Sequence, residues 1–467
     1  MPRTRSIQGP PGALDWTGAL NGQGPRYQRV IRFLERAITD GQLRPGDRLP
    51  PQRQLAEQLN LDLTTVTRAY AEARARDLIH ARGALGTFVS VPKVELSPVI
   101  DLSMNIPPPP VGIDFTDLLK RGIAQVLTYT DADKLMNYQP SGGGKAERAA
   151  GAQWLAPMLG LVDPARIAVT PGAQAALAGL ILALTQPGDS ILTEAMTYPG
   201  LLSASRELGR TLKVVESDAH GMTPDALERA CRNHQASVVY LNPTLQNPTT
   251  TTMPAERRRD IVRVAERHDR QIIEDDPYWL LAEDAPSPLV HWAADRVHYI
   301  ATLSKCLSPG LRTAYVVSPS DAAQGDLLSA LRAITLMSAP LATSLATQWI
   351  YDGTAGNILE GVKAEASARQ KLAEQIFRGT ERRWPRTAIH MWIELPDVWT
   401  PQELAIAARM ESMAVTSSDA FSAGASNARA IRVSLGGVRE RHHLERALRK
   451  LAGLLERKST PFDRFLI

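Results

Sequence analysis

The chain has 467 residues, of which 44% are hydrophobic and 22% charged, the profile of a water-soluble protein large enough for two or three domains. Its longest nearly apolar run, residues 173–184, is too short to span a bilayer, and two cysteines, Cys231 and Cys306, are too few for a disulfide framework. No apolar core follows the first residues, so we expect no secretion signal, no membrane segment and a cytoplasmic protein.

Charge is distributed unevenly along the chain. Residues 1–92 contain 13 arginines, no lysine and 8 acidic residues, a net charge of +5, whereas the whole chain carries +4. The remainder is therefore close to neutral. A small basic module joined to a larger neutral one indicates an anionic partner for the N-terminal part, although so modest an excess does not decide this alone.

Three helices are predicted in the basic part. Apolar residues repeat at helical spacing over residues 27–40, and Gly41 then ends the helix. A short second helix is expected over residues 52–59, and Asp62 is a suitable N-cap for a third. Two helices separated by so short a turn form a helix-turn-helix.

The next residues predict a β-hairpin. Residues 78–79 and 87–89 have strand character and flank a glycine-containing turn at residues 82–86, which is typical of a wing. The run 27–91 closely resembles the winged-helix domain of GntR-family repressors, whose Gly-x-Leu-x-Pro-Gly-Asp-x-Leu-Pro signature is present at residues 41–50. This resemblance implies that the module binds double-stranded DNA.

The third predicted helix departs from the commonest form of these repressors. Leu63 and Thr67 occupy positions where arginine is frequent, so the base contacts of those positions are not transferred. Our candidates for contacting DNA are polar side chains of the second and third helices: Arg53, Thr64, Thr65 and Arg68. Each of them is equally well explained as part of a solvated helix face.

Composition divides the chain into three parts. Residues 24–92 are assigned to a winged helix-turn-helix domain, and residues 93–111 to a proline-rich linker. Four consecutive prolines, residues 107–110, form neither helix nor sheet interior and make a stiff, extended spacer. Strand and helix patterns alternate over residues 112–467, as in a large α/β domain.

Two segments of this large domain place ligand-binding groups at the edge of a sheet. Residues 167–177 predict a strand, a turn at Gly172 and an alanine-rich helix, whose free N-terminal N–H groups suit a phosphate. Residues 271–275 predict a buried strand ending in Asp275 and Asp276, and ligands bind at the carboxyl ends of strands in open α/β folds. Taken singly, both patterns are common structural punctuation.

The most informative residue is Lys305. It follows a β-rich stretch, lies near the hydroxyls of Thr302 and Ser304, and precedes a fixed cation at Arg312. A Schiff-base lysine needs an amine held at one point with phosphate-binding donors beside it, and this pattern supplies both. A surface lysine on a polar turn is the alternative for the residue taken singly.

These segments, with others around Tyr138, Tyr198 and Asn247, resemble in the same order the cofactor site of fold-type I pyridoxal 5'-phosphate (PLP) aminotransferases. By that resemblance Lys305 forms the aldimine with PLP, and Asp275, rather than Asp276, pairs with the pyridine nitrogen. The other contacts that the resemblance implies are Tyr278 and Asn247 on the phenolate oxygen, Tyr198 on the ring face, Ala173, Gln174, Thr302 and Arg312 on the phosphate, and Tyr138 on a neighbouring subunit's phosphate. The chain departs from the family at Thr250, where glycine is usual, so the geometry of that loop is not carried over.

A late strand carries a candidate for effector binding. Residues 430–434 alternate as a short strand that presents Arg432, and the segment is similar to the strand that carries the carboxylate-binding arginine of aminotransferases. Its planar guanidinium matches a carboxylate in two parallel hydrogen bonds. A structural arginine paired with a nearby acid is the alternative, and Arg429 is a weaker candidate for the same role.

A GntR-like winged helix followed by an aminotransferase-like domain is the architecture of the MocR subgroup of transcription regulators. The resemblance implies a head-to-tail homodimer that binds DNA and PLP and senses an amino compound through the aldimine at Lys305. Two alternatives remain: a sensor of PLP itself, and a working aminotransferase with an accessory DNA-binding module. All three need the same PLP-holding groups. We expect no metal site.

Overall fold

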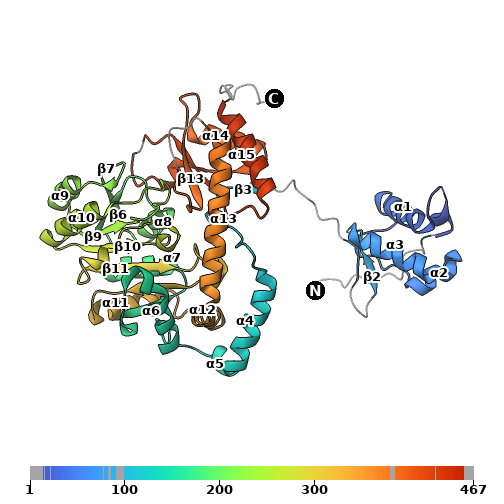
Figure 1. The fold of residues 1–467 in the computed structure, drawn as a ribbon, viewed down its shortest axis with the longest axis horizontal. Coiled ribbons are helices and arrows are strands. Elements are labelled where there is room, and N and C mark those ends of the chain that lie inside the picture. Colours follow the sequence, from blue (N-terminus) through green and yellow to red (C-terminus); the bar gives the residue numbers. More distant parts are fainter. Residues whose placement is uncertain are drawn as a thin grey trace, which may run out of the picture. The chain divides into compact units, whose positions relative to one another are not determined.

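The computed structural model describes residues 14, 16–21, 23–76, 78–81, 86–90, 99–378, 384–425 and 427–456 (Figure 1). It divides into two compact units, Met1–Ser97 and Pro98–Ile467, and each is described by itself. Among the helices within these residues, none is long and apolar enough to cross a membrane.

The first unit is a small helical bundle with a hairpin. Its elements are η1 (Trp16–Leu20), α1 (Arg26–Thr39), α2 (Gln52–Leu59), α3 (Leu63–Ala75), β1 (Ile79–Ala81) and β2 (Thr87–Val89). The apolar faces of the three α-helices meet in one core that includes Ile31, Leu55 and Val66. The helices predicted from the sequence are therefore present, and they form because each buries one apolar face against the others.

The turn between α2 and α3 is as short as the sequence predicts. Asn60 adopts φ 48°, a left-handed conformation that asparagine tolerates, and Asp62 occupies the N-cap of α3. The carboxylate of Asp62 makes no capping hydrogen bond to the described backbone. β1 and β2 pair antiparallel with Ile79 opposite Val89, and the tip of this predicted wing, residues 82–85, lies outside the described residues.

The second unit contains a seven-stranded sheet with the order β4-β12-β11-β10-β9-β5-β6. The strands are β4 (Ile167–Thr170), β5 (Ser190–Glu194), β6 (Thr211–Val215), β9 (Ala236–Leu241), β10 (Gln271–Asp275), β11 (Val297–Thr302) and β12 (Ala314–Val317). β12 runs antiparallel to both neighbours, and the other pairs are parallel. The carboxyl ends of β9, β10 and β11 therefore lie at the same edge of the sheet.

Helices cover both faces of this sheet. Alternate strand residues face opposite helical layers: Ile273 and Ile300 face one, and Ile272 and Tyr299 face the other. The first layer is α7 (Ala173–Leu184), α8 (Pro199–Glu207) and α11 (Asp321–Ile334), and the second is α6 (Lys145–Leu159), α9 (Pro224–Asn233), α10 (Ala255–Arg267) and α12 (Pro340–Tyr351). The α/β fold class expected from the sequence is confirmed.

A second, smaller sheet forms its own core. It has the order β13-β16-β15, built from β13 (His390–Glu394), β15 (Thr416–Ser417) and β16 (Ala430–Ser434), and it packs with α14 (Pro401–Met410) and α15 (Arg441–Glu456). The long helix α13 (Thr354–Ile376) contributes Ile358 to the core of the large sheet and Ala373 to that of the small one (Figure 1). Other elements of this unit are α4 (Phe115–Tyr129), α5 (Ala132–Leu135), and the short strands β7 (Ser217–Asp218) and β8 (Gly221–Met222).

The stretch expected as a linker, residues 93–111, belongs in large part to the second unit. β3 (Ile100–Asp101) pairs in parallel with β14 (Met413–Ala414), and Leu102 is fully buried in the core of the small sheet. The four prolines lie outside helices and strands, as predicted. Strand pairing and burial nevertheless hold residues 99–111 on the second unit, which corrects the boundary at residue 112.

Candidate functional site

A cavity of about 250 Å³ opens where the carboxyl ends of β9, β10 and β11 meet the N-terminus of α7. Residues predicted from the sequence line it: Ala173, Gln174, Tyr198, Asn247, Asp275, Tyr278, Thr302, Lys305 and Arg312. They are far apart in the chain and meet because strand ends in a parallel sheet converge on one edge.

Lys305 lies in the turn that follows β11 and is partly buried. Its Nζ donates a hydrogen bond to the carbonyl of Asn105. Burial lowers the pKa of Lys305 from 10.5 to about 8; the cations Arg432 and Arg312 act in the same direction, and Asp275 opposes them. The neutral amine is the nucleophilic form, so this lysine is ready to attack an aldehyde at a lower pH than a surface lysine.

Asp275 presents a free carboxylate oxygen at the end of β10. Its Oδ2 accepts a hydrogen bond from the hydroxyl of Tyr240 (2.7 Å), whereas Oδ1 is buried and has no hydrogen-bond partner among the described residues. Burial raises the pKa of Asp275 to about 6, because the charged form is costly there without a bound cation. The neighbouring Asp276 does not line the cavity and instead accepts a hydrogen bond from Thr244 (3.1 Å).

Tyr278 and Asn247 bring two hydrogen-bonding groups to the cavity. The Tyr278 hydroxyl accepts a hydrogen bond from Nδ2 of Asn105 (2.9 Å), and burial raises its pKa, so it remains a neutral donor. Asn247 Oδ1 accepts a hydrogen bond from Nη1 of Arg432 (2.8 Å). Tyr278 and Asn247 thus lie in the cavity with groups that can meet a ligand oxygen.

Arg432 is buried on β16 beside the cavity. Its guanidinium lies over the ring of Phe421 (4.9 Å), and Nη2 donates to the carbonyl of Ser103. Its Nε has no hydrogen-bond partner, and Arg432 makes no ion pair with any described residue. The structural alternative from the sequence, an arginine in an ion pair with a nearby acid, is therefore not found among these residues, although burial lowers the pKa of Arg432 and the charge of Asp101 acts to raise it.

The N-terminus of α7 forms another wall of the cavity. Gly172 precedes the helix with φ 89°, and a Cβ at this position would lie 2.7 Å from Nη2 of Arg312, so glycine is required. Nη2 of Arg312 donates a hydrogen bond to the carbonyl of Pro171 (3.1 Å). The other N–H groups of the guanidinium are left to bind an anion. The first N–H groups of the helix, at Ala173 and Gln174, complete a cradle for an anion.

Thr302 lines the cavity but has little hydrogen-bonding capacity left. Its hydroxyl lies 3.1 Å from Oγ of Ser304 and 3.2 Å from the carbonyl of Thr313, so its single proton is used within the protein. Ser304, named from the sequence only for its position near Lys305, lines the cavity as well. Tyr198 lines the same space, and burial raises its pKa to about 12.

Two residues predicted for this site, Tyr138 and Arg432, do not line the cavity, and two polar residues that line it were missed. Tyr138 is 79% exposed and does not line the cavity of its own chain. Asn242, at the end of β9, donates from Nδ2 to the carbonyl of Asp275 (2.5 Å) and accepts from the amide of Asn247 (2.7 Å). The sequence could have indicated Asn242, because it lies only five residues before Asn247. Asn105 also lines the cavity, and its position next to the prolines gave no signal of that kind.

The loop after Asn247, whose geometry was left open because threonine replaces the usual glycine, has a strained backbone. Thr250 adopts φ 61°, in the left-handed region that glycine favours and that costs other residues about 1–2 kcal/mol. Its amide donates to the carbonyl of Gln246 (2.7 Å), and its hydroxyl donates to the carbonyl of Thr249 (2.6 Å). The loop therefore keeps its turn with threonine in place of the usual glycine.

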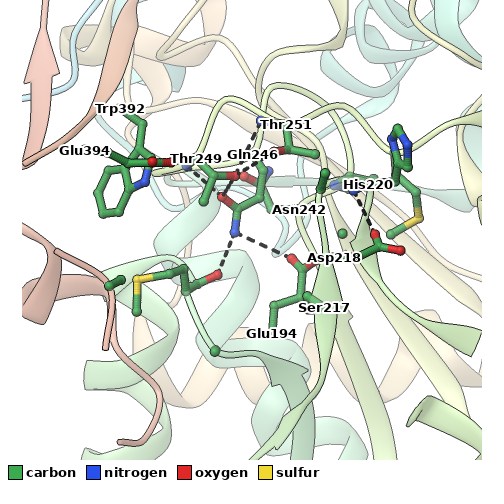
Figure 2. A pocket seen from close by; sticks show the side chains of 17 residues that line it. Glu194, Ser217, Asp218, His220, Asn242, Gln246, Thr249, Thr251, Trp392 and Glu394 are labelled. Atoms are coloured by element: carbon green, nitrogen blue, oxygen red, sulfur yellow. Dashed lines mark hydrogen bonds between the residues drawn. The ribbon is translucent and has the colours of Figure 1, made fainter. Parts of the chain in front are cut away.

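A larger cavity of about 840 Å³ lies on another side of this loop (Figure 2). Gln246 holds the loop there: its Nε2 donates to the carbonyl of Met196 (2.6 Å), and its Oε1 accepts from the hydroxyl of Thr249 (2.7 Å). Burial raises the pKa of Glu194, at the end of β5, to about 7. None of the side chains predicted from the sequence lines this second cavity, although Asn242 lines both.

In the first unit, the four candidates for DNA contact lie on solvent-accessible faces of α2 and α3: Arg53, Thr64, Thr65 and Arg68. The guanidinium of Arg68 stacks over the ring of Tyr27 at 4.1 Å. Thr67, at a position where arginine is frequent in such repressors, donates to Oε1 of Gln52 (2.8 Å) and so joins α3 to α2.

The donors of the smaller cavity fit PLP. Lys305 offers an amine of lowered pKa, Asp275 a buried carboxylate oxygen without a partner, and the start of α7 with Arg312 a cradle for a phosphate. When bound, PLP supplies an aldehyde that forms a Schiff base with a primary amine and a ring that withdraws electrons. Asp275 would hold the ring nitrogen, and Tyr278 and Asn247 would bind the ring oxygen.

The fold and the site together define a winged helix-turn-helix protein with an aminotransferase-like, PLP-binding domain. Residues 97–451 match the family of class I and II aminotransferases, and residues 26–89 match the gntR family of bacterial regulatory proteins. The chain therefore belongs to the class I and II aminotransferase family, with a gntR-type DNA-binding domain at its N-terminus. This is the domain order of MocR-type transcription regulators, and the protein is a DNA-binding regulator of that type.

Two transcription regulators and one aminotransferase match most of the chain. The uncharacterized HTH-type transcriptional regulator YdeF of Bacillus subtilis is 28% identical over 454 residues, which cover 95% of this chain and 97% of YdeF. The vitamin B6 salvage pathway transcriptional repressor PtsJ of Salmonella typhimurium is 28% identical over 390 residues, which cover 80% of this chain and 86% of PtsJ. The crystal structure of an archaeal alanine:glyoxylate aminotransferase superposes with a TM-score of 0.71 and 25% identity, covering 78% of this chain and 93% of that one.

Proposed function

We propose that the protein regulates transcription in response to an amino compound, or to PLP itself, sensed through the cofactor at Lys305. The observation that carries the proposal is Arg432, a buried cation that forms no ion pair with a described residue and lies beside the cofactor cavity. A buried charge is costly without a counter-charge, so the site favours a ligand with a carboxylate. The effector class is therefore an amino acid or a similar carboxylated amine.

Each group of the site has a defined task in this proposal. Asp275 binds the ring nitrogen and keeps it protonated, because the carboxylate and the N–H⁺ each supply what the other lacks in the buried site. Lys305, with its lowered pKa, would hold the cofactor, and the amine of the effector would compete with Lys305 for it. Arg432 then orients the effector by its carboxylate in two parallel hydrogen bonds. The effector shifts DNA binding only if it binds two conformations of the protein unequally.

Spectral titration of the Arg432→Ala protein tests the effector class. L-alanine is compared with ethylamine, which has the same carbon framework without the carboxylate. We expect the variant to bind alanine tens to several hundred times more weakly, since a charge-assisted bidentate pair contributes about 2–4 kcal/mol, and to bind ethylamine nearly as before. Equal weakening for both ligands would mean that Arg432 only supports the fold.

Arg429→Ala is the matched control for this titration. Arg429 precedes the same strand, but its Nη2 donates to the carbonyls of Asp397 and Trp399 (both 2.7 Å). It is therefore committed to backbone groups outside the cavity. Its loss should leave the difference between alanine and ethylamine unchanged.

A second candidate function is a catalytically active PLP-dependent aminotransferase with an accessory DNA-binding module. The observation that favours it is the complete set of groups at the cavity, including Lys305, Asp275 and Tyr278. These groups are also needed merely to hold PLP, so their presence does not establish turnover. Repeated release of keto acid from an amino acid and a second keto acid would support the enzyme, and conversion limited to one equivalent per site would support the sensor.

We also propose that the protein acts as a head-to-tail homodimer in the cytoplasm, where the DNA lies. Large apolar side chains are exposed on neighbouring segments of the second unit: Met136 is 88% exposed, Tyr129 and Tyr138 are 79% exposed, and Leu341 is 44% exposed. Such a surface suits a second copy of the chain, whose phosphate site Tyr138 would then reach. Two DNA-binding units per dimer fit paired operator half-sites. Met136→Glu should halve the mass measured by light scattering.

A further inference from the structure

Asn105 connects the cofactor lysine to the start of the second unit. Its carbonyl accepts the hydrogen bond of Lys305 Nζ. Its Nδ2 donates to the hydroxyl of Tyr278 (2.9 Å) and lies 3.2 Å from Nδ1 of His390. Asn105 is buried, with 7% of its surface exposed, and its Oδ1 has no hydrogen-bond partner among the described residues. The side chain thus fixes the carbonyl that Lys305 uses.

The same short segment also contacts the effector arginine. Two residues earlier, the carbonyl of Ser103 accepts hydrogen bonds from Nη2 of Arg432 and from Oγ1 of Thr416 (3.2 Å). Residues 103–105 therefore occupy hydrogen-bonding groups of both Lys305 and Arg432. Immediately upstream, the amides of Ile100 and Leu102 pair with the carbonyls of Ser412 and Ala414 on the small-sheet side (2.8 Å each).

We propose that residues 103–105 report the occupancy of the cavity to the chain that leads to the DNA-binding unit, with Asn105 as the positioning residue. The inference rests on the function proposed above for Lys305 and Arg432. A free lysine ammonium has three N–H donors, and a lysine nitrogen bonded to a ligand carbon keeps at most one. A carboxylate on Arg432 likewise competes with the carbonyl of Ser103. Both binding events therefore remove hydrogen bonds from the same three residues.

The hydrogen bonds that residues 99–102 keep determine how the segment responds to ligand binding. Residues 99–102 stay paired with the small-sheet side when residues 103–105 lose their hydrogen bonds from Lys305 and Arg432, so the segment is held less tightly on the cavity side, where the contact of Asn105 with Tyr278 remains. Residues 99–105 lie at the start of the second unit, directly after the first unit in the sequence. A change in their mobility thus reaches the connection between the two units. Loss of two net hydrogen bonds corresponds to a change on the order of tenfold in an equilibrium.

Hydrogen–deuterium exchange of the full-length protein, with and without saturating PLP, tests this inference. In the wild type, PLP should speed exchange several-fold in peptides covering residues 99–106. In Asn105→Ala, exchange there should already be fast without PLP and should change less than about twofold on its addition. Asn357→Ala, an exposed asparagine on α13, is the control and should behave like the wild type. If Asn105→Ala does not fold, Asn105→Ser carries the same expectation.

The second readout is the affinity for duplex DNA from upstream of the protein's own gene, measured with and without PLP. The ratio of the two dissociation constants should be on the order of tenfold in the wild type and close to one in Asn105→Ala. A wild-type ratio retained by the variant would overturn the role of Asn105. Wild-type exchange in residues 99–106 that ignores PLP would also overturn it, even if DNA affinity responds. Exchange that responds while wild-type DNA affinity does not would support the local role of Asn105 and contradict the proposed sensing function.

Discussion

At the scale of single residues, the site is defined by two titratable groups, Asp275 and Lys305, whose pKa values are shifted by burial. Burial raises the pKa of Asp275 to about 6 and lowers that of Lys305 to about 8. Each group is thereby shifted toward its neutral form, although the opposite charge of the other partly counters the shift on Lys305. A ligand that brings a cation to Asp275 and a carbonyl carbon to Lys305 removes both costs at once.

The lowered pKa of Lys305 makes cofactor attachment depend on pH near neutrality. Only the neutral amine attacks an aldehyde, so the attachment rate should rise with pH and level off above a midpoint of about 8. Asp275→Asn removes an anion that favours the charged lysine and should move the midpoint down. Arg432→Met removes a cation and should move it up. Stopped-flow absorbance after mixing with PLP measures the rate, and a midpoint that stays near 10.5 would contradict this account.

Gly172 shows how one missing side chain shapes the phosphate end of the cavity. Gly172→Ala places a Cβ 2.7 Å from Arg312 Nη2 at a backbone φ of 89°. We expect a loss of about 1–2 kcal/mol of stability from the backbone and, in addition, weaker PLP binding from displacement of Arg312. Gly188→Ala is the control, because Gly188 has φ 93° and open space around its Cβ position. It should lose stability and keep its PLP affinity, as judged by thermal unfolding and spectral titration.

At the scale of elements, the sequence predicted the parts of the site that lie on regular structure. Asp275, Lys305 and the start of α7 follow strands, and strand ends converge whatever lies between them. Asn105 and the contact of Arg432 with Asn247 could not be predicted in this way, because they join segments more than 170 residues apart through irregular chain. The proline run led to the wrong prediction of a linker over residues 93–111 for the same reason. Local composition indicates an extended backbone and does not indicate what that backbone packs against.

Arg258 on α10 holds the loop that carries Asn242 and Asn247. Arg258 is fully buried; it donates to the carbonyls of Pro243 (3.1 Å) and Met253 (2.9 Å), one at each side of the loop, and lies 3.9 Å from Glu274. Arg258 therefore fixes both ends of the loop. It is also the cation next to the buried acid Glu274. Burial raises the pKa of Glu274 to about 8.

Arg258→Met should destabilise the protein by about 3–5 kcal/mol, because it leaves buried carbonyl acceptors without their donor and removes the cation beside the buried acid Glu274. Thermal and urea unfolding measure this loss. Arg263→Met, on the same helix but exposed and in an ion pair with Asp260, should change stability by less than about 1 kcal/mol. Similar losses for the two variants would show that Arg258 does not hold the loop.

At the scale of the whole molecule, the protein combines a basic DNA-binding unit with a PLP-binding unit. Binding of duplex DNA should weaken steeply with salt, because arginines that neutralise phosphates release counterions. Arg53→Ala and Arg68→Ala should each weaken binding and reduce the salt slope, without changing the absorbance of bound PLP. Fluorescence anisotropy over a range of salt concentrations measures the slope. A slope unchanged in both variants would remove these arginines from the DNA interface.

The central claim is that a ligand at Lys305 changes how the protein binds DNA. The most direct measurement compares the DNA affinity of the full-length wild type and of Lys305→Ala, each without PLP, with PLP, and with PLP and L-alanine. We expect the wild-type affinity to change by at least about fivefold between these states, the lower range of typical coupling between sites, and the Lys305→Ala affinity to stay constant. A wild-type affinity that is the same in all three states would contradict the account.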